Sequence, residues 1–323
     1  MSETYSHLSV LPDEIVGYAP TNCHRILDCT LGGAGHSLKL LKAFPEAILT
    51  GADRDPAALE AAAQTLKPVE QRVQLLHCAF SHLDDLLSPD VLFDYIIADI
   101  GVSSPQLDQA DRGFSFLYEG PLDMRMDPST QKITAAELVR TLSEEALARI
   151  FFQWGEEPMS RRIARAIVQE RQQTPITTTS HLAALTAAAV PKKFHKKGFH
   201  PATLTFQALR IAVNQELNEL ESLLRTMIKY LDLYGRLAII SFHSLEDRIV
   251  KNHFRSWENP CQCPSSLPYC VCGKKPLGRT LSKKPVTASA VEQKLNSRSR
   301  SAKLRIFERT LEHLPDLTAF SYD

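Results

Sequence analysis

The segment that most constrains the fold is a short apolar strand that leads into a glycine-rich turn and then a helix. Residues 25–37 are Arg-Ile-Leu-Asp-Cys-Thr-Leu-Gly-Gly-Ala-Gly-His-Ser. A helical pattern of leucines follows, and a second apolar run, Ala47–Ala52, ends in Asp53. This unit is typical of a doubly wound α/β sheet, in which an acid ending the second strand accepts hydrogen bonds from ribose hydroxyls. We therefore expect the first half of the chain to bind an adenosine-containing cofactor.

The spacing of the glycines and a nearby acid distinguish two classes of cofactor. Dinucleotide sites favour Gly-x-Gly-x-x-Gly and a helix N-terminus that faces a pyrophosphate. Here the glycines are Gly32, Gly33 and Gly35, and Asp28 stands just before the loop. An acid there would repel a pyrophosphate but would suit the sulfonium and ammonium groups of S-adenosylmethionine. The loop thus favours S-adenosylmethionine over NAD, and a plain glycine-rich turn is the alternative.

Composition indicates a globular protein. The chain has 323 residues, of which 44% are hydrophobic and 23% charged, enough for a large core in two domains. No apolar run approaches the roughly 20 residues needed to span a bilayer, and the N-terminus lacks the regions of a secretory signal. We therefore expect a cytoplasmic protein with no membrane partner. Its seven cysteines are expected to be reduced thiols or metal ligands.

Basic residues are unevenly distributed, although 37 basic and 37 acidic residues balance overall. Residues 171–215 contain no Asp or Glu, and Glu292 is the only acid in residues 259–307. The basic residues of these two stretches are Arg171, Lys192, Lys193, Lys196, Lys197, Arg210, Lys274, Lys275, Arg279, Lys283, Lys284, Lys294, Arg298, Arg300, Lys303 and Arg305. Such stretches in a neutral protein favour a surface that binds nucleic acid over two solvated loops.

Alternating strand and helix patterns predict a parallel sheet that is interrupted by an insertion. The strand-like runs are Arg25–Leu31, Ala47–Asp53, Val73–Phe80 and Phe93–Ile100. Helical patterns such as Pro56–Leu66 separate them, which predicts right-handed crossovers. The next clear strand, Arg236–Phe242, begins over 130 residues after the fourth one ends, far beyond an ordinary connection. A separate segment is therefore inserted between the fourth and fifth strands.

The inserted segment is predicted to be helical. Apolar residues recur with helical period in Ala135–Leu142, Glu144–Trp154, Ser160–Gln172 and Ser180–Val190, and the expected N-caps are Thr134, Ser143 and Ser180. A longer helix, Thr203–Tyr230, returns the chain to the sheet, and a last strand, Lys303–Arg309, is expected to close the sheet edge. The predicted division is a discontinuous sheet domain, 1–108 and 206–323, around a helical domain, 109–205.

Candidate site residues stand where the predicted strands end. They are Asp28, Asp53, Phe80, Asp99 and Phe242. Ligands of open α/β sheets bind beyond the carboxyl ends of the strands, so these residues are expected to share one edge. The alternative is that each acid is an exposed loop residue, which would have to hold independently for all three acids.

Several further motifs are distinctive. They are Arg112–Phe116, Gly198–Leu217, Asn296–Arg305, Gly-Val-Ser-Ser-Pro-Gln-Leu-Asp at 101–108, Gly-Pro-Leu-Asp-Met-Arg-Met-Asp at 120–127 and Ser-Phe-His-Ser-Leu-Glu-Asp-Arg at 241–248. With these motifs, the chain closely resembles the MraW family of bacterial 16S ribosomal RNA cytosine-N4 methyltransferases. The resemblance runs from His7 to about Arg309, nearly the whole chain.

The resemblance implies a class I, Rossmann-like methyltransferase sheet with an inserted helical domain for substrate recognition. It implies methyl transfer from S-adenosylmethionine to N4 of a cytidine in the decoding centre, which fine-tunes the ribosomal P site. The partner is then 16S ribosomal RNA within the small ribosomal subunit, and a monomer and a homodimer both remain open. Matched by motif, the implied cofactor contacts are Ala34, Gly35, His36, Asp53, Phe80, Asp99 and Gln106.

The chemistry of an amino group explains which residues could be catalytic. The exocyclic amine of cytosine is a poor nucleophile because its lone pair is delocalised into the ring. Catalysis needs acceptors for the amino hydrogens and in-line placement against the sulfonium methyl, but no metal or covalent nucleophile. Asp99 and the backbone of Ser104 and Pro105 are the candidate acceptors. His36 and His243 are assigned no catalytic role.

A base in folded RNA must leave its stack to reach such a pocket. Phe114, Phe116 and Phe242 are candidate stacking partners, and packing in the core is at least as good an explanation for each. Phosphate contacts would position the RNA without reading its sequence. The candidates for these contacts are Arg112, Arg125, Lys192 to Lys197, Arg298, Arg300 and Lys303.

A cysteine cluster lies apart from these motifs. Two Cys-x-Cys pairs, separated by six residues, comprise Cys261, Cys263, Cys270 and Cys272. Four thiolates this close can hold zinc, although the usual spacing within each pair is wider. Reduced structural thiols are the alternative, and both remain open. The other cysteines, Cys23, Cys29 and Cys78, are expected in the core.

Other functions can be distinguished from methyl transfer to the small ribosomal subunit. An NAD-dependent oxidoreductase would need a glycine spacing that this loop lacks. An assembly factor that has lost turnover would bind RNA without transferring a methyl group. An adenine-N6 or DNA substrate would use similar pocket chemistry.

Overall fold

The computed structural model describes residues 9–195, 197–264, 267, 269–315 and 317. The chain divides into two compact units, each of which is considered by itself. The first combines Met1–Gly101 with Asn218–Asp323, and the second is Val102–Leu217. The second unit therefore extends beyond the expected range of 109–205 at both ends. Within the described residues, no helix combines the length and the hydropathy that a membrane span requires.

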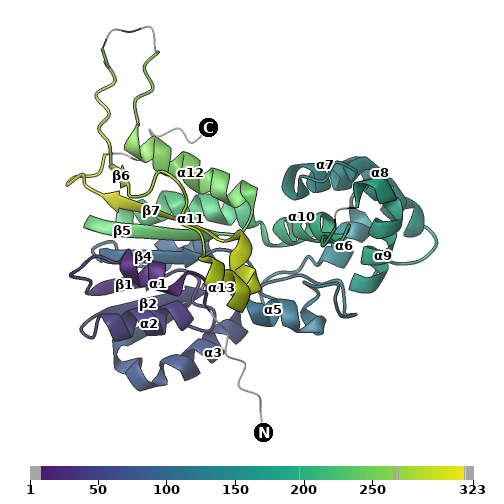
Figure 1. The fold of residues 1–323 in the computed structure, drawn as a ribbon, viewed down its shortest axis with the longest axis horizontal. Helices are drawn as coiled ribbons and strands as arrows, with labels where there is room; N and C mark the ends of the chain where they lie inside the picture. The colour runs from purple at the N-terminus through teal and green to yellow at the C-terminus, as the bar shows by residue number, and fades with distance from the viewer. Residues whose placement is uncertain (1–8, 196, 265–266, 268, 316, 318–323) are drawn as a thin grey trace. The chain divides into compact units, whose positions relative to one another are not determined.

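A seven-stranded sheet forms the centre of the first unit (Figure 1). Its strands are β1 (Arg25–Asp28), β2 (Ile48–Asp53), β3 (Val73–His77), β4 (Phe93–Asp99), β5 (Leu231–Ser241), β6 (Gly278–Thr280) and β7 (Lys303–Arg309). The order is β3-β2-β1-β4-β5-β7-β6. Strands β1 to β5 are parallel, and β7 runs antiparallel to both β5 and β6. The predicted α/β fold is confirmed.

Helices bury both faces of this sheet, as parallel sheets require. They are α1 (Pro12–Gly17), α2 (Gly35–Ala43), α3 (Pro56–Leu66), α4 (Leu83–Leu86), α11 (Glu216–Tyr230), α12 (Ser244–Glu258) and α13 (Ala290–Leu295). The neighbours Ile26 and Leu27 of β1 enter two different apolar clusters, because successive side chains of a strand point to opposite faces. Helices α11 and α12 line one cluster, and α1 and α2 line the other. The strand ends are therefore held between two packed layers.

The second unit is helical, as predicted. Its helices are α5 (Ser104–Asp108), α6 (Ala135–Thr141), α7 (Glu144–Gly155), α8 (Ser160–Glu170), α9 (Thr179–Ala189) and α10 (Thr203–Asn214). Thr134 and Ser143 are the N-caps of α6 and α7, and each side chain accepts a backbone N–H of the first turn. The prediction of Ser180 as an N-cap is wrong. Thr178 caps α9 instead, and the Ser180 hydroxyl donates to Glu119.

The single helix predicted over Thr203–Tyr230 is interrupted. Gln215 adopts a left-handed conformation with φ 51°, which ends α10, and α11 begins at the next residue. Asn214 fixes the end of α10, because its side-chain amide accepts the Met126 N–H and donates to the Met124 carbonyl, both at 2.8 Å. The apolar pattern runs through the break and conceals it.

The sheet edge also differs from the prediction. Strand β7 lies between β5 and β6, so the three-residue strand β6 forms that edge. A strand this short leaves no periodic signal. Gly278 makes the pairing possible, because a Cβ there would come within 2.0 Å of the Glu308 carbonyl oxygen. Strand β5 also begins earlier than the predicted Arg236, at Leu231.

Candidate functional site

The glycine-rich loop between β1 and α2 is tied to the end of β2. The Leu31 N–H donates to the Ala52 carbonyl at 2.9 Å, and the Gly32 N–H donates to Oδ2 of Asp53 at 2.8 Å. Ala34 precedes α2 with φ 63°, a left-handed conformation that is strained for a residue with a Cβ. Strained residues of this kind cluster at ligand sites, which agrees with the expected role of the loop.

Asp28 and Asp53 end neighbouring strands and are fixed by the same loop. Asp28 is buried and accepts the Ser37 hydroxyl at 2.6 Å and the Thr30 N–H at 3.1 Å. Burial raises the pKa of Asp28 to about 6, although these hydrogen bonds oppose the shift. Asp53 also accepts the Asp55 N–H at 2.9 Å, and burial raises its pKa as well. Backbone N–H groups of Gly32, Arg54 and Asp55 thus orient the Asp53 carboxylate, which can accept up to four hydrogen bonds.

Asp99 ends β4 on the other side of β1. Its N–H donates to the Thr30 hydroxyl at 2.6 Å, so Thr30 connects Asp99 with Asp28. Burial, together with the charges of Asp28 and Glu246, raises the pKa of Asp99 to about 8. Oδ1 of Asp99 is buried and has no hydrogen-bond partner among the described residues. Asp28, Asp53 and Asp99 are called the acidic rim below.

His36 lies beside the acidic rim in the first turn of α2. Its Nε2 donates to the Val10 carbonyl at 2.7 Å, because a carbonyl can only accept. Nδ1 therefore faces Asp99, with 3.9 Å between Nδ1 and Oδ2. This distance is too long for a hydrogen bond between the two side chains.

Phe242 and Phe80 occupy the ends of the two remaining parallel strands. Phe242 follows β5 and lies against Gly101, where a Cβ would come within 3.3 Å of the phenylalanine ring. Gly101 has φ 131°, which strongly favours glycine, so the ring can lie close to the chain just after Asp99. Phe80 comes three residues after β3 and packs partly against the core. The residues expected at this edge, from Asp28 to Phe242, therefore all lie at or just beyond strand ends.

Three other predicted site residues belong to the second unit. Ser104, Pro105 and Gln106 form the first turn of α5, with Ser103 as N-cap. The Gln106 side chain accepts the Ser103 N–H at 3.0 Å, and the Ser103 hydroxyl accepts the Gln106 N–H at 3.4 Å. The Pro105 carbonyl accepts the Gln109 N–H within the helix. These bonds fix the turn that follows Asp99 in the sequence.

The candidate base-stacking and phosphate residues near 112–125 have structural partners. Phe114 is 6% exposed within the core of the second unit, so packing explains it. Phe116 is partly buried and contacts the rings of His200 and Phe206. Arg112 donates to the carbonyls of two residues, and Arg125 pairs with Asp123 at 2.7 Å. Both guanidinium groups therefore brace the motif at 120–127.

The basic stretches divide into exposed and paired residues. Lys192, Lys193 and Lys197 are exposed, and Lys196 lies outside the described residues. The Lys193 ammonium lies 5.1 Å from the centre of the Phe194 ring, and Phe194 is itself 46% exposed. In the second stretch, Arg300 is exposed, whereas Lys303 and Arg305 both pair with Asp247. The buried Arg305 thus stabilises the fold and is not a candidate phosphate contact.

Sequence reasoning missed the residues that support the acidic rim. Ser37 is fully buried and holds Asp28, and Thr30 holds both Asp28 and Asp99. Glu246 accepts the backbone N–H groups of Phe242 and His243 and fixes the turn after β5. A hydroxyl two residues after a strand-end acid was a visible signal for Thr30. No sequence signal marks Ser37.

Comparison with known proteins gives full-length matches. A family model described as the MraW methylase family matches residues 4–310. Three similar proteins are called ribosomal RNA small subunit methyltransferase H. The protein of Trichlorobacter lovleyi is 50% identical over 95% of this chain and 99% of its own. The protein of Symbiobacterium thermophilum is 49% identical over 86% of this chain and 88% of its own. The protein of Clostridium botulinum is 46% identical over 94% of this chain and 98% of its own.

Proposed function

Because the chain belongs to the MraW methylase family, we propose that it methylates N4 of a cytidine in the decoding centre of 16S ribosomal RNA, with S-adenosylmethionine as donor. As a member of this family it is a methyltransferase, and its sheet is of the class I type that uses S-adenosylmethionine. Its relatives are named for ribosomal RNA of the small subunit. The finer assignment to cytidine N4 is a proposal that rests on the motifs shared with the family, and the acidic rim is consistent with an amine substrate.

The acidic rim is the observation that supports this donor. A cationic sulfonium stabilises ionised carboxylates, so it would bind where burial makes Asp28 and Asp99 hard to ionise. A pyrophosphate would add negative charge at the same place, which argues against NAD. Asp53 would accept the ribose hydroxyls, and Phe80 would contact the adenine. The loop residues Ala34, Gly35 and His36 would complete the cofactor contacts of this unit, and Gln106 is a further candidate contact from the motif.

Asp99 is the proposed acceptor of the amino hydrogens. Its Oδ1 has no hydrogen-bond partner within the part of the chain that the structure describes, so a lone pair is available to hold an N–H of cytosine. The N4 lone pair attacks the methyl carbon, the carbon–sulfur bond breaks, and the sulfur keeps the bonding electrons. The resulting ammonium then loses a proton, which Asp99 or water can receive. The backbone at Ser104 and Pro105, at most six residues further along the chain, is the proposed second acceptor.

The inserted helical unit is proposed to recognise the RNA. Exposed lysines next to an exposed aromatic ring suit a phosphate backbone and an unstacked base. Lys192, Lys193 and Phe194 provide this combination. The exposed Arg300 of the first unit is a further candidate phosphate contact.

Transfer of a labelled methyl group tests the proposed donor and turnover. The full chain is incubated with S-adenosylmethionine labelled in its methyl group and with small ribosomal subunits that lack the modification. We expect label in the RNA and none in the protein, and no activity supported by NAD. Tight binding to the subunit without transfer would instead favour an assembly factor, and it would overturn the enzymatic assignment.

A further inference from the structure

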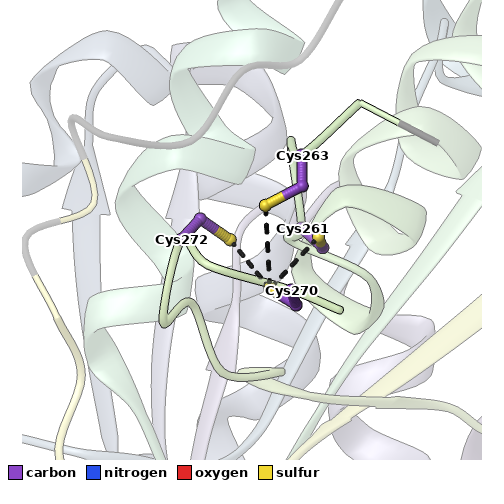
Figure 2. A group of neighbouring side chains, drawn as sticks. All are labelled: Cys261, Cys263, Cys270 and Cys272. Carbon is purple, nitrogen blue, oxygen red and sulfur yellow. Dashed lines mark hydrogen bonds between the residues drawn. The ribbon is translucent and has the colours of Figure 1, made fainter. Parts of the chain in front are cut away.

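Four cysteine side chains come together in the segment between α12 and β6 (Figure 2). Figure 1 shows this segment as a long excursion that leaves the sheet unit beyond the end of α12. Their sulfur atoms all lie within 4.8 Å of one another. The Cys270 sulfur lies 3.4 Å from that of Cys261, 3.9 Å from that of Cys263 and 3.3 Å from that of Cys272. The first pair of cysteines stands on one leg of the excursion and the second pair on the other.

We propose that these four cysteines bind one zinc ion, which holds the two legs of the excursion together. Tetrahedral zinc with Zn–S bonds of about 2.3 Å places neighbouring ligand sulfurs about 3.8 Å apart. The three measured sulfur separations, from 3.3 to 3.9 Å, lie around this value. Small rotations of the side chains would therefore complete the tetrahedron. The narrow Cys-x-Cys spacing is no obstacle, because each pair supplies two corners from its own leg.

The excursion needs such a cross-link because its described apolar residues beyond the neck are exposed. Tyr269 is 73% exposed and Val271 is 65% exposed, and Leu267 is exposed as well. The neck is closed by a hydrogen bond from the Leu277 N–H to the Trp257 carbonyl at 2.8 Å. Short segments that cannot bury apolar surface are commonly stabilised by metals or disulfides. The cysteines stand at the place where such a cross-link would have the greatest effect, between the neck and the tip.

The surroundings of the sulfur atoms suit thiolate ligands. The Val271 N–H donates to the Cys263 sulfur at 3.4 Å. The backbone N–H groups of Gln262 and Lys274 donate hydrogen bonds to the Cys272 sulfur. Donors of this kind stabilise ligating groups in metal sites. Zinc with four thiolates carries a net negative charge, and Lys274 and Lys275 come two and three residues after the last cysteine. Basic neighbours therefore offset the charge of the complex.

Metal analysis of the full chain tests the proposal. Protein purified under reducing conditions is exposed to excess zinc, passed over a desalting column and analysed by mass spectrometry of the elements. We expect about one zinc per chain, and cobalt in place of zinc should give the visible absorption of a tetrahedral thiolate site. Protein that keeps no metal after this treatment overturns the proposal. So does protein whose four cysteines are already joined in disulfides.

Matched variants assign the metal to these residues. The double variant Cys261→Ser and Cys272→Ser removes one ligand from each leg and should lose the bound zinc. Cys78→Ser, which changes a cysteine outside the excursion, should keep it. The fold of both variants is checked by circular dichroism, because Cys78 packs against an apolar cluster of the sheet unit. A double variant that folds and still binds one zinc would overturn the assignment. Removal of zinc from the natural protein should also speed proteolysis between residues 258 and 277.

Discussion

Asp28 and Asp99 give the candidate site its electrostatic character. In the free protein their pKa values are raised to about 6 and about 8, mainly because desolvation disfavours both carboxylates. A buried carboxyl that ionises with difficulty gains most from a nearby cation. We therefore propose that both residues favour a sulfonium compound and that Asp99, once ionised, accepts the hydrogens of an amine.

Binding of S-adenosylmethionine should strengthen as the pH rises. At pH 5.5 both carboxyls are largely protonated, and at pH 8.5 both are largely ionised, since their pKa values are about 6 and about 8. A cation binds the ionised forms more tightly, so the dissociation constant should fall at least about tenfold over this range. Isothermal titration calorimetry measures the constant at each pH.

S-adenosylhomocysteine is the matched control for this pH dependence. It has the same nucleoside and amino acid but no sulfonium, so its affinity should change much less. The variant Asp99→Asn should flatten the upper part of the profile for S-adenosylmethionine. Parallel profiles for the two ligands would show that the rim does not sense the sulfonium charge.

Asp53→Ala should weaken cofactor binding and leave RNA binding largely intact. The carboxylate accepts the Gly32 N–H and is the proposed partner of the ribose, so its loss affects both the loop and the ligand. We expect a loss of affinity of at least about tenfold, equivalent to about 1.4 kcal/mol. Calorimetry with S-adenosylmethionine and filter binding with the small subunit separate the two effects. Equal loss of both affinities would count against the assigned role.

Elements with strong periodicity could be predicted from the sequence. The first four strands and helices α6 to α9 lie within a few residues of their predicted ranges, because apolar residues recur at the period of each element. The strand β6 and the break at Gln215 could not be predicted. One is too short to show a period, and the other depends on hydrogen bonds of Asn214 to residues far away in the sequence.

Gln215→Gly should stabilise the protein. Gln215 is exposed and has φ 51°, a conformation that costs a non-glycine residue about 1 kcal/mol. Glycine removes this cost, although it gains more freedom in the unfolded state. We expect a rise of about 0.5 kcal/mol in the free energy of unfolding, measured by urea denaturation. Gln215→Ala keeps the Cβ and should bring no such gain. A lower urea midpoint for the glycine variant would refute the argument.

At the scale of the whole molecule, charge is segregated while the net charge is zero. The structure shows which basic residues of the two stretches are already paired. Arg279 forms an ion pair with Glu308, and Arg305 forms one with Asp247. The lysines at 192, 193 and 197 remain exposed. Exposed cations that have no acidic neighbours in the sequence are the ones available to a polyanion.

Neutralising Lys192, Lys193 and Lys197 with glutamine should weaken RNA binding. The logarithm of the binding constant falls linearly with the logarithm of the salt concentration. Each lost phosphate contact makes this slope shallower by about 0.7 to 0.9. We therefore expect the slope to fall by about 2, measured by filter binding at several salt concentrations. The control variant changes Lys42, Lys67 and Lys251, which are equally exposed but lie outside the basic stretches. An unchanged slope would remove the residues 192–197 from the interface.

The acids of the candidate site could be predicted from the sequence, because they stand at strand ends. The residues that support these acids could not be predicted. Asp28, Asp53 and Asp99 follow from one rule about the edges of parallel sheets. The roles of Ser37 and Glu246 depend on which side chains point inward after folding, and a linear pattern does not contain that information. The same limit applies to Arg112 and Arg125, whose carbonyl and carboxylate partners the sequence does not reveal.

The position of the transferred methyl group tests the central claim most directly. Small ribosomal subunits without the modification are treated with the protein and a donor that carries a deuterated methyl group. Their RNA is then cut into defined fragments and analysed by mass spectrometry. We expect deuterated N4-methylcytidine at a single cytidine of the decoding centre. Deuterium in another nucleoside, or at a cytidine outside the decoding centre, would contradict it.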